Sequence, residues 1–284
     1  KLINIFYLKK IMCILCNMLG LCGIENLGNT CYMNSVLQCL YGNKEFIEYY
    51  LSKQFLKSLT DHETNALSIE YYRMVHTISK NSDGYITPSQ FHRLIVIISH
   101  KYSNGEFQVG RQCDAHLFLV FLLDNLHNNV KREVTATIKG DVKNNLDKLA
   151  LESMKCWKCF FEKEYSPIVK LFTGQYCSHV TCPENKTDSY NFDPFNNLQL
   201  EIPEKEHIDL YDCFRHFTKD EVLTDYKQDG HEYHRCMSIF NLPKYLTISL
   251  KRFKGNQKIS TFVDFPIDLL DLTPFYKGYN KNKY

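Results

Sequence analysis

The segment Gly23-Ile-Glu-Asn-Leu-Gly-Asn-Thr-Cys31-Tyr-Met-Asn-Ser-Val-Leu-Gln-Cys-Leu40 joins a polar turn to an amphipathic pattern. After Cys31, the apolar residues follow the i, i+3, i+4, i+7 spacing of a helix with one buried face: Met33, Val36, Leu37 and Leu40. Asn29 and Thr30 precede the pattern directly, and both have side chains suited to capping a helix. We therefore predict a helix that begins near Cys31.

Cys31 lies where a thiol is most useful as a nucleophile. The thiolate is the attacking form, and a helix N-terminus stabilises negative charge through its unpaired N–H groups and its dipole. The Gly28-Asn-Thr30 turn can direct the amide of Cys31 at a reacting carbonyl, and Asn26 can add a side-chain donor, which together would form an oxyanion hole. A cysteine at a helix start is more often a small buried hydrophobic residue, so this feature alone leaves both interpretations open.

The remaining pattern changes from helical to strand-like along the chain. Apolar spacing predicts further helices at 46–59, 67–78, 91–98 and 114–128. After Pro167, short alternating runs broken by turn residues predict strands at 168–172, 174–180, 195–202 and 245–253. Helices followed by a sheet that we expect to be antiparallel indicate an α+β architecture in two lobes.

Composition bounds the class of protein. The chain has 284 residues, of which 44% are hydrophobic, enough for one large domain or two ordinary ones. A net charge of +2 gives no field that favours nucleic acid as a partner. The 12 cysteines have irregular spacing, so we expect a reducing compartment, cytoplasmic or nuclear, rather than a disulfide framework.

Residues 1–19 are expected to be an N-terminal extension. The apolar run at 11–22 superficially resembles a signal-peptide core, but Asn17 interrupts it and the chain does not begin with methionine; Met12 is an alternative start. No run reaches the roughly 20 apolar residues needed to cross a bilayer. We expect a soluble monomer with no membrane partner.

Over its full length, the 23–40 segment resembles the Cys box of the ubiquitin-specific proteases. The resemblance implies a papain-like cysteine protease in which Cys31 attacks the carbonyl after the C-terminal glycine of ubiquitin and Asn26 is the oxyanion donor. Four later segments resemble the same family in the expected order: 110–119, 166–175, 242–253 and 262–272. This implies a catalytic domain at 20–284, comprising a helical thumb (20–163), fingers (164–240) and an incomplete palm (241–284).

The segment Gly110-Arg-Gln-Cys-Asp-Ala-His-Leu-Phe-Leu119 resembles the family's Gln-Gln-Asp-Ala-x-Glu-Phe box. The resemblance implies that Gln112 and Asp114 bind the substrate, with the aspartate holding the backbone of the ubiquitin tail. Leu117 stands where the family has glutamate, which removes one acceptor for the arginines of the tail. Because Asp114 also precedes a clear helical pattern, we expect it to serve as an N-cap as well.

Two cysteine pairs raise the possibility of zinc, namely Cys156 with Cys159 and Cys177 with Cys182. Many family members hold zinc at the fingertips with four cysteines, and the corresponding positions here are Cys182, Asn185, Gln228 and His231. Only two of these four are ordinary zinc ligands. We therefore expect no bound metal and no cofactor, with Cys156 and Cys159 as free thiols on a helix.

A thiol protease also needs an imidazole base and a group that orients it. In the family both follow the segment that ends here near Leu272, in a Gly-His-Tyr box and a later Asp or Asn. None of the 11 histidines lies in such a box, so we expect the catalytic His and Asp/Asn to be absent from residues 1–284. His231 and His116 are the alternatives, and we expect neither to be catalytic.

Three functions remain open at this point. The preferred one is a deubiquitinating cysteine protease, cut short of its histidine, with ubiquitin or ubiquitinated proteins as partner. The second is a protein that binds ubiquitin without cleaving it. The third is a zinc-dependent interaction module, which the eroded ligand set disfavours.

Overall fold

The computed structural model describes residues 22–81, 84–184, 186–223, 231–255 and 257–278. The chain forms two compact units, one of residues 1–132 and 166–171 and the other of residues 133–165 and 172–284. The predicted extension at 1–19 lies outside the described residues. The division into thumb, fingers and palm stays a prediction.

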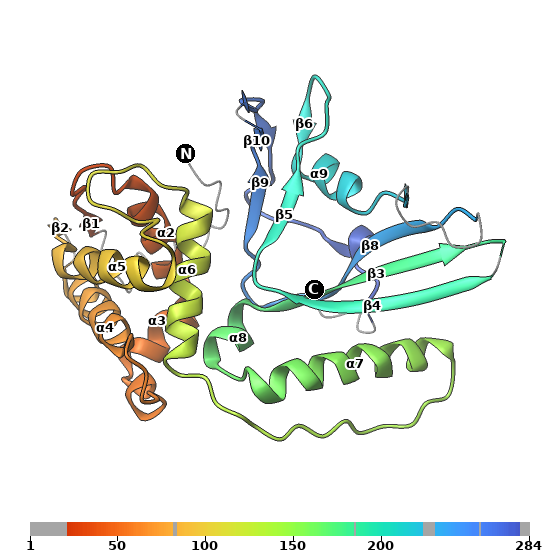
Figure 1. The fold of residues 1–284 in the computed structure, drawn as a ribbon, viewed down its shortest axis with the longest axis horizontal. Coiled ribbons are helices and arrows are strands. Elements are labelled where there is room, and N and C mark those ends of the chain that lie inside the picture. The colour runs from red at the N-terminus through yellow and green to blue at the C-terminus, as the bar shows by residue number, and fades with distance from the viewer. Residues whose placement is uncertain (1–21, 82–83, 185, 224–230, 256, 279–284) are drawn as a thin grey trace. The chain divides into compact units, whose positions relative to one another are not determined.

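The first unit is helical (Figure 1). Its helices are α2 (Cys31–Tyr41), α3 (Lys44–Leu51), α4 (Asn65–Lys80), α5 (Ser89–Tyr102), α6 (Ala115–Asn128) and most of α8 (Pro167–Phe172), with a short 3-10 helix at Gln54–Lys57. A small parallel ladder pairs β1 (Gly23–Ile24) with β2 (Tyr85–Ile86). The helices predicted to begin near Cys31 and at 67–78, 91–98 and 114–128 are confirmed, with slightly different ends.

Two predictions in this unit are wrong. The single helix expected at 46–59 is divided, because Lys53 takes a left-handed conformation with φ of 59° that ends α3. The strand expected at 168–172 is the helix α8. Ser166 Oγ accepts a hydrogen bond from the amide of Val169 at 3.0 Å, and Pro167 occupies the first helical position, so capping chemistry outweighs the short alternation.

The second unit contains a four-stranded antiparallel sheet in the order β4-β3-β8-β7. Its strands are β3 (Gly174–Cys182), β4 (Thr187–Phe195), β7 (Glu221–Val222) and β8 (His234–Asn241). The long helix α7 (Asn145–Lys163) runs along β4 (Figure 1). A buried hydrogen bond of 2.6 Å from Ser153 Oγ to Gln175 Oε1 joins α7 to β3.

The expectation that the second half is wholly antiparallel is wrong. Two pairs are parallel, β5 (Leu198–Glu201) with β9 (Ile248–Lys251) and β6 (Ile208–Asp209) with β12 (Val263–Asp264). Parallel neighbours need a long crossover connection, and helix α9 (Leu210–Phe217) lies within the one that joins β5 to β9. Sequence analysis missed α9, although Asp209 and Asp212 form a capping box at its start. The remaining elements are β10 (Phe253–Lys254), β11 (Gln257–Lys258) and the 3-10 helix Thr273–Phe275.

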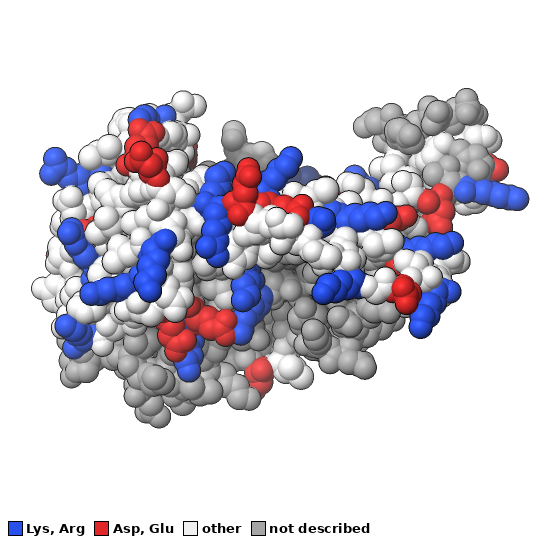
Figure 2. Space-filling view, turned by 90° about the horizontal axis from the view of Figure 1, so that it is seen from below, with Lys and Arg blue, Asp and Glu red and all other residues white. Residues whose placement is uncertain are grey.

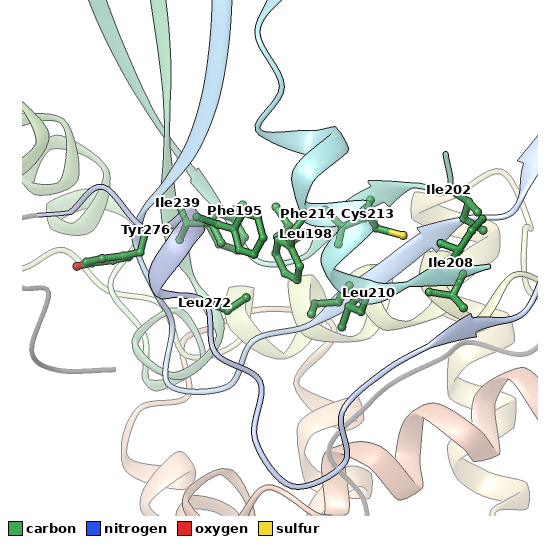
Figure 3. Close-up of a cluster of buried hydrophobic side chains, with 14 residues drawn as sticks. Phe195, Leu198, Ile202, Ile208, Leu210, Cys213, Phe214, Ile239, Leu272 and Tyr276 are labelled. Carbon is green, nitrogen blue, oxygen red and sulfur yellow. The ribbon is translucent and has the colours of Figure 1, made fainter. Parts of the chain in front are cut away.

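The main core of the second unit surrounds α9 (Figure 3). Phe214 from this helix is fully buried and stacks on Phe275, with 5.1 Å between ring centroids. Leu198 and Leu200 of β5 belong to the same cluster. The amphipathic helix is therefore the element that holds the parallel strands and the C-terminal segment together.

Basic and acidic side chains are interspersed on the face drawn in Figure 2. Within the described ranges, no helix combines the length and apolar character needed to cross a membrane.

Candidate active site

Cys31 is the first residue of α2 and is exposed. The turn before it needs two consecutive residues in the left-handed region, Gly28 with φ of 94° and Asn29 with φ of 56°. Glycine and asparagine are the residues that adopt this conformation at least cost. The tight turn expected from the sequence is therefore present.

The side chain of Asn26 organises this turn. Its carboxamide oxygen accepts from the amide of Gly28 at 3.0 Å, and from both the amide and the hydroxyl of Thr30 at 3.1 Å. The Thr30 hydroxyl in turn accepts from the amide of Leu27 at 3.0 Å. Because the oxygen is engaged, the orientation of the Asn26 side chain is fixed, and its NH₂ group is the part left to donate elsewhere.

The expected capping of α2 by Asn29 and Thr30 side chains is wrong. Thr30 is the N-cap residue, but no side chain caps the helix. The Thr30 hydroxyl instead bonds back into the turn, and the Asn29 side chain bonds elsewhere. The helix ladder begins with the 3.0 Å bond from the amide of Asn34 to the carbonyl of Thr30, so the amide of Cys31 precedes it.

Two amide side chains on α2 hold the segment that leads into the turn. Asn34 Nδ2 donates to the carbonyls of Ile24 at 3.1 Å and Glu25 at 3.0 Å, and Gln38 Nε2 donates to the carbonyl of Cys22 at 3.0 Å. The sequence analysis above did not predict these roles of Asn34 and Gln38. Their i, i+4 spacing was the available signal, since it places both amides on one side of the helix.

A hydrogen bond of 2.7 Å from Asn29 Nδ2 to the carbonyl of Gly110 ties the turn to the loop before α6. In that loop Gln112 is exposed and makes no hydrogen bond within the described residues, while the Cys113 thiol is buried and donates to the carbonyl of Glu106 at 3.3 Å. Asp114 is the N-cap of α6, and its Oδ1 accepts from the amide of His116 at 2.8 Å, which confirms the capping role. The Cys31 segment and the 110–119 segment, which are far apart in the sequence, are therefore joined by a hydrogen bond.

Packing between α2 and α6 reinforces this arrangement. The ring of Tyr32, next to Cys31, packs edge-on against Phe118, with 5.4 Å between centroids, and stacks on Phe107 at 5.8 Å. Burial, with the Cys113 thiol nearby, raises the pKa of Tyr32 well above its usual range. Burial also lowers the pKa of His116, against the opposing effect of Asp114.

The structure describes two of the four positions that the resemblance compares with the family's zinc site. Cys182 is buried at the end of β3, and its thiol donates to Glu184 Oε2 at 3.2 Å. His231 is half-buried, while Asn185 and Gln228 lie outside the described residues. Amide side chains at two of four positions are poor partners for zinc. In the part of the chain that the structure describes, no three histidine, cysteine or acidic side chains gather to hold a metal. Cys156 and Cys159 are exposed on α7, the helix where they were expected.

The α+β fold is of the ubiquitin-specific protease type. The structure is similar to that of a SAGA DUB module in which a cysteine-to-alanine variant of Ubp8, with Sgf11, Sus1 and Sgf73, is bound to monoubiquitin. The TM-score is 0.68, with 24% sequence identity over 92% of this chain and 55% of that chain. A second solved structure, the Ubp8/Sgf11/Sus1/Sgf73 module bound to ubiquitin aldehyde, gives a TM-score of 0.67 and 25% identity over 91% of this chain and 54% of that chain.

The sequence pattern of the family described as ubiquitin carboxyl-terminal hydrolase matches residues 22–284, and the chain belongs to this family. It is 38% identical over 280 residues to human ubiquitin carboxyl-terminal hydrolase 2, covering 90% of this chain and 44% of the relative. It is 31% identical over 280 residues to ubiquitin carboxyl-terminal hydrolase 4 of Saccharomyces cerevisiae, covering 89% of this chain and 30% of the relative. The chain thus spans less than half the length of these relatives.

Proposed function

We propose that this chain is the part of a deubiquitinating cysteine hydrolase that supplies the nucleophile, oxyanion hole and tail-binding loop. The substrate is ubiquitin or a ubiquitinated protein, and the (iso)peptide bond after the C-terminal glycine is cut. The observation that carries the proposal is the Asn26 turn. Three hydrogen bonds hold the Asn26 oxygen inside the turn, so that its NH₂ group and the amide of Cys31 remain as donors.

In this mechanism an imidazole takes the proton of the Cys31 thiol, the thiolate adds to the glycine carbonyl carbon, and the C–N bond breaks as the amine leaves with that proton. Water then hydrolyses the thioester and frees the thiol. The developing negative charge on the carbonyl oxygen is stabilised by Asn26 Nδ2 and the Cys31 amide. Gln112 and Asp114 bind the extended tail of ubiquitin, since the loop that carries them is bonded to the nucleophile turn through Asn29 and Gly110. The proposal includes a reducing compartment, the cytoplasm or nucleus, which agrees with the 10 described cysteines all being free thiols.

The proposal does not assign the general base to a histidine of this chain. No histidine of residues 1–284 lies in a Gly-His-Tyr box, so we expect slow or absent hydrolysis by this chain alone. The second candidate is a protein that binds ubiquitin without cleaving it.

Two measurements on the chain of residues 1–284 separate these functions. The first is hydrolysis of a ubiquitin C-terminal fluorogenic amide. The second compares the affinities of ubiquitin aldehyde and ordinary ubiquitin, because the aldehyde adds reversibly to a thiol and presents an oxyanion to the hole. We expect the aldehyde to bind more tightly, and Cys31→Ala to abolish this advantage. Cys156→Ala, at another exposed cysteine, is the matched control and should preserve it.

Other results would change the assignment. Equal affinity for aldehyde and ordinary ubiquitin would support the binding protein. Brisk hydrolysis that Cys31→Ala abolishes would show that a histidine within this chain serves as base. Failure to bind either form would overturn both functions.

A further inference from the structure

Helix α7, which runs along β4 in Figure 1, carries two exposed thiols one turn apart. Cys156 and Cys159 both lie within this helix, and both are free. The helix is anchored to the sheet through Ala150 and Ser153, which are buried, and through the 2.6 Å hydrogen bond from Ser153 Oγ to Gln175 Oε1. The two thiols are therefore accessible to small molecules, while the helix that carries them is fixed.

The spacing of the two cysteines is compatible with a disulfide, but only with a strained one. From the rise and radius of an α-helix, Cα atoms three residues apart are separated by about 5 Å, within the roughly 4.4–6.8 Å that disulfides span. Their Cβ atoms are about 5–6 Å apart on a regular helix, whereas a disulfide needs about 3.5–4.5 Å. Closing the bond therefore requires the turn to tighten, and strained disulfides are the ones that are easily reduced.

The charges along α7 distinguish the two thiols. Cys159 lies four residues from Lys155 and four from Lys163, a spacing that places all three on one side of the helix. Both lysines are exposed, and neither forms an ion pair within the described residues. Neighbouring cations favour the thiolate, which is the form that attacks a disulfide, and they attract anionic reagents. Cys159 is therefore the better placed of the two to react first.

The acidic side chains nearby do not oppose this order. Glu162 is engaged, since its Oε1 accepts from the amide of Ala136 at 2.8 Å and lies 3.7 Å from Lys158 Nζ. Glu152 is four residues before Cys156 but about two turns from Cys159, so its charge acts mainly on Cys156. In the described part of the chain, no three histidine, cysteine or acidic side chains gather to hold a metal, so the thiol pair is not a metal site there.

We propose that Cys156 and Cys159 form a reversible dithiol–disulfide site that reacts with anionic low-molecular-weight disulfides, such as glutathione disulfide. The Cys159 thiolate attacks one sulfur of the reagent and forms a mixed disulfide, and the expelled thiolate takes up the proton that Cys159 lost. The Cys156 thiolate then attacks the Cys159 sulfur and expels the second thiol, which takes up the proton of Cys156. The chain loses two hydrogen atoms, and the reagent is reduced to two thiols.

This site goes beyond the proposed function and does not depend on it. In a reducing compartment the pair is open, and the strained bond forms only while oxidised disulfides are abundant. Excess reduced glutathione should open it again by the reverse exchange.

The test treats the full chain with glutathione disulfide, blocks the remaining thiols by alkylation and digests the product with trypsin. Trypsin cuts after Lys155, Lys158 and Lys163, so the two cysteines leave on the separate peptides 156–158 and 159–163. We expect mass spectrometry to find these two peptides joined by a disulfide. Treatment with excess reduced glutathione before alkylation should yield them separately.

Substitutions test the order of the two steps. Cys156→Ser should stop the reaction at a mixed disulfide on Cys159, because no second thiol follows. Lys163→Gln should slow formation of the linked product roughly two- to fivefold, the range expected of one exposed charge pair. Lys148→Gln is the matched control, since Lys148 is exposed on the same helix but three turns from Cys159, and it should leave the rate unchanged.

Glutathione carried separately by Cys156 and Cys159, with no linked peptide, would overturn the inference. No reaction at either cysteine would do the same, provided that exposed Cys31 in the same sample acquires glutathione and so shows that the reagent is active. A link that persists in excess reduced glutathione would also contradict it, because the bond would then be structural rather than reversible.

Discussion

The side-chain amide of Asn29 donates a 2.7 Å hydrogen bond to the backbone carbonyl of Gly110, 81 residues further along the chain. This bond joins the turn that presents Cys31 to the loop that ends at Asp114. Both partners have positive φ, 56° at Asn29 and 72° at Gly110, so the contact depends on two backbone conformations that few residues accept. The bond therefore helps to fix the position of the Cys31 turn relative to the loop before α6.

Replacing Asn29 tests this connection. Asn29→Gly keeps the left-handed backbone accessible but removes the hydrogen bond, so we expect the free energy of unfolding to fall by about 1 kcal/mol. Affinity for ubiquitin aldehyde should also fall, because turn and loop are no longer aligned. Asn104→Gly is the control, as Asn104 has a similar φ of 48° and no part in the turn. Unchanged aldehyde affinity in Asn29→Gly would contradict the role of this bond.

Asn26 allows positioning to be separated from oxyanion stabilisation. Asn26→Asp retains an oxygen that accepts from Gly28 and Thr30, but it lacks the NH₂ donor. We expect near-native stability and a 10²- to 10³-fold loss of the affinity advantage of ubiquitin aldehyde over ubiquitin, on the order of the effect of one oxyanion-hole donor. Asn26→Ala should lose the tighter binding of ubiquitin aldehyde relative to ubiquitin. It should also lower the free energy of unfolding by roughly 2 kcal/mol, since the hydrogen bonds that the Asn26 oxygen accepts are removed. An aldehyde advantage that survives in Asn26→Asp would rule out the donor role.

Two substitutions separate the capping of α6 by Asp114 from its proposed role in ubiquitin binding. Asp114→Ser retains a good N-cap for α6 without a carboxylate, whereas Asp114→Ala removes both. We expect the alanine variant to lose about 1 kcal/mol of stability and the serine variant to lose little. Ubiquitin affinity should fall in both, measured by titration with labelled ubiquitin. Full affinity in Asp114→Ser would limit this residue to capping.

Stability of the chain should decrease as the pH falls below about 6.5. Burial lowers the pKa of His116 and that of His92, whose Nε2 has no hydrogen-bond partner among the residues that the structure describes. The folded state therefore binds fewer protons than the unfolded state, so stability is full above the ordinary histidine pKa of 6.5 and is lost as pH falls toward the lowered value.

Urea unfolding at pH 7.5 and 5.5 measures this difference, with a slope of at most about 1.4 kcal/mol per pH unit for each histidine. His92→Gln should make the stability less dependent on pH, whatever its effect on the absolute value. His100→Gln, at an exposed position, is the control for the loss of a histidine from the surface. An identical pH dependence in His92→Gln and the wild type would show that burial of His92 is not its source.

Purified chain should contain far less than one zinc per molecule, and a chelator should not change its melting temperature. The four positions that correspond to the family's zinc site explain this expectation. Two of them are amide side chains, and the Cys182 thiol donates a hydrogen bond to Glu184. Elemental analysis measures the stoichiometry. A value near one would contradict the expectation, and Cys182→Ser would then show whether the metal is at the fingertip.

Sequence patterns were sufficient where the determinant is local. The helices after Cys31 and Asp114 are read from apolar spacing, and the tight turn from Gly28 and Asn29. Patterns failed where a strong local signal competed with a weak one, as at Ser166 and Pro167, whose capping chemistry converts an alternating run into α8. They also failed at α9, where Asp209 and Asp212 carried a capping signal that was overlooked.

Pairing of distant segments was beyond such patterns. The parallel ladders of β1 with β2 and of β5 with β9 join segments separated by dozens of residues, and no repeat or turn signal marks their register. Local patterns likewise did not predict the hydrogen-bond partners of the side chains around Cys31. Asn29 and Thr30 were suited to capping by type, but the folded chain offers Asn29 a carbonyl at Gly110 and Thr30 a partner in Asn26.

The sequence by itself determined the family and the α+β class, because these depend on residue types at short spacings, and it predicted Cys31 as the nucleophile. Tertiary structure decided how the Cys31 segment is presented. The Asn26 oxygen accepts hydrogen bonds within the turn, Asn29 is hydrogen-bonded to Gly110, and Tyr32 packs against Phe118. Hydrogen-bond partners and exposure depend on which distant segments meet when the chain folds, and local spacing does not contain that information.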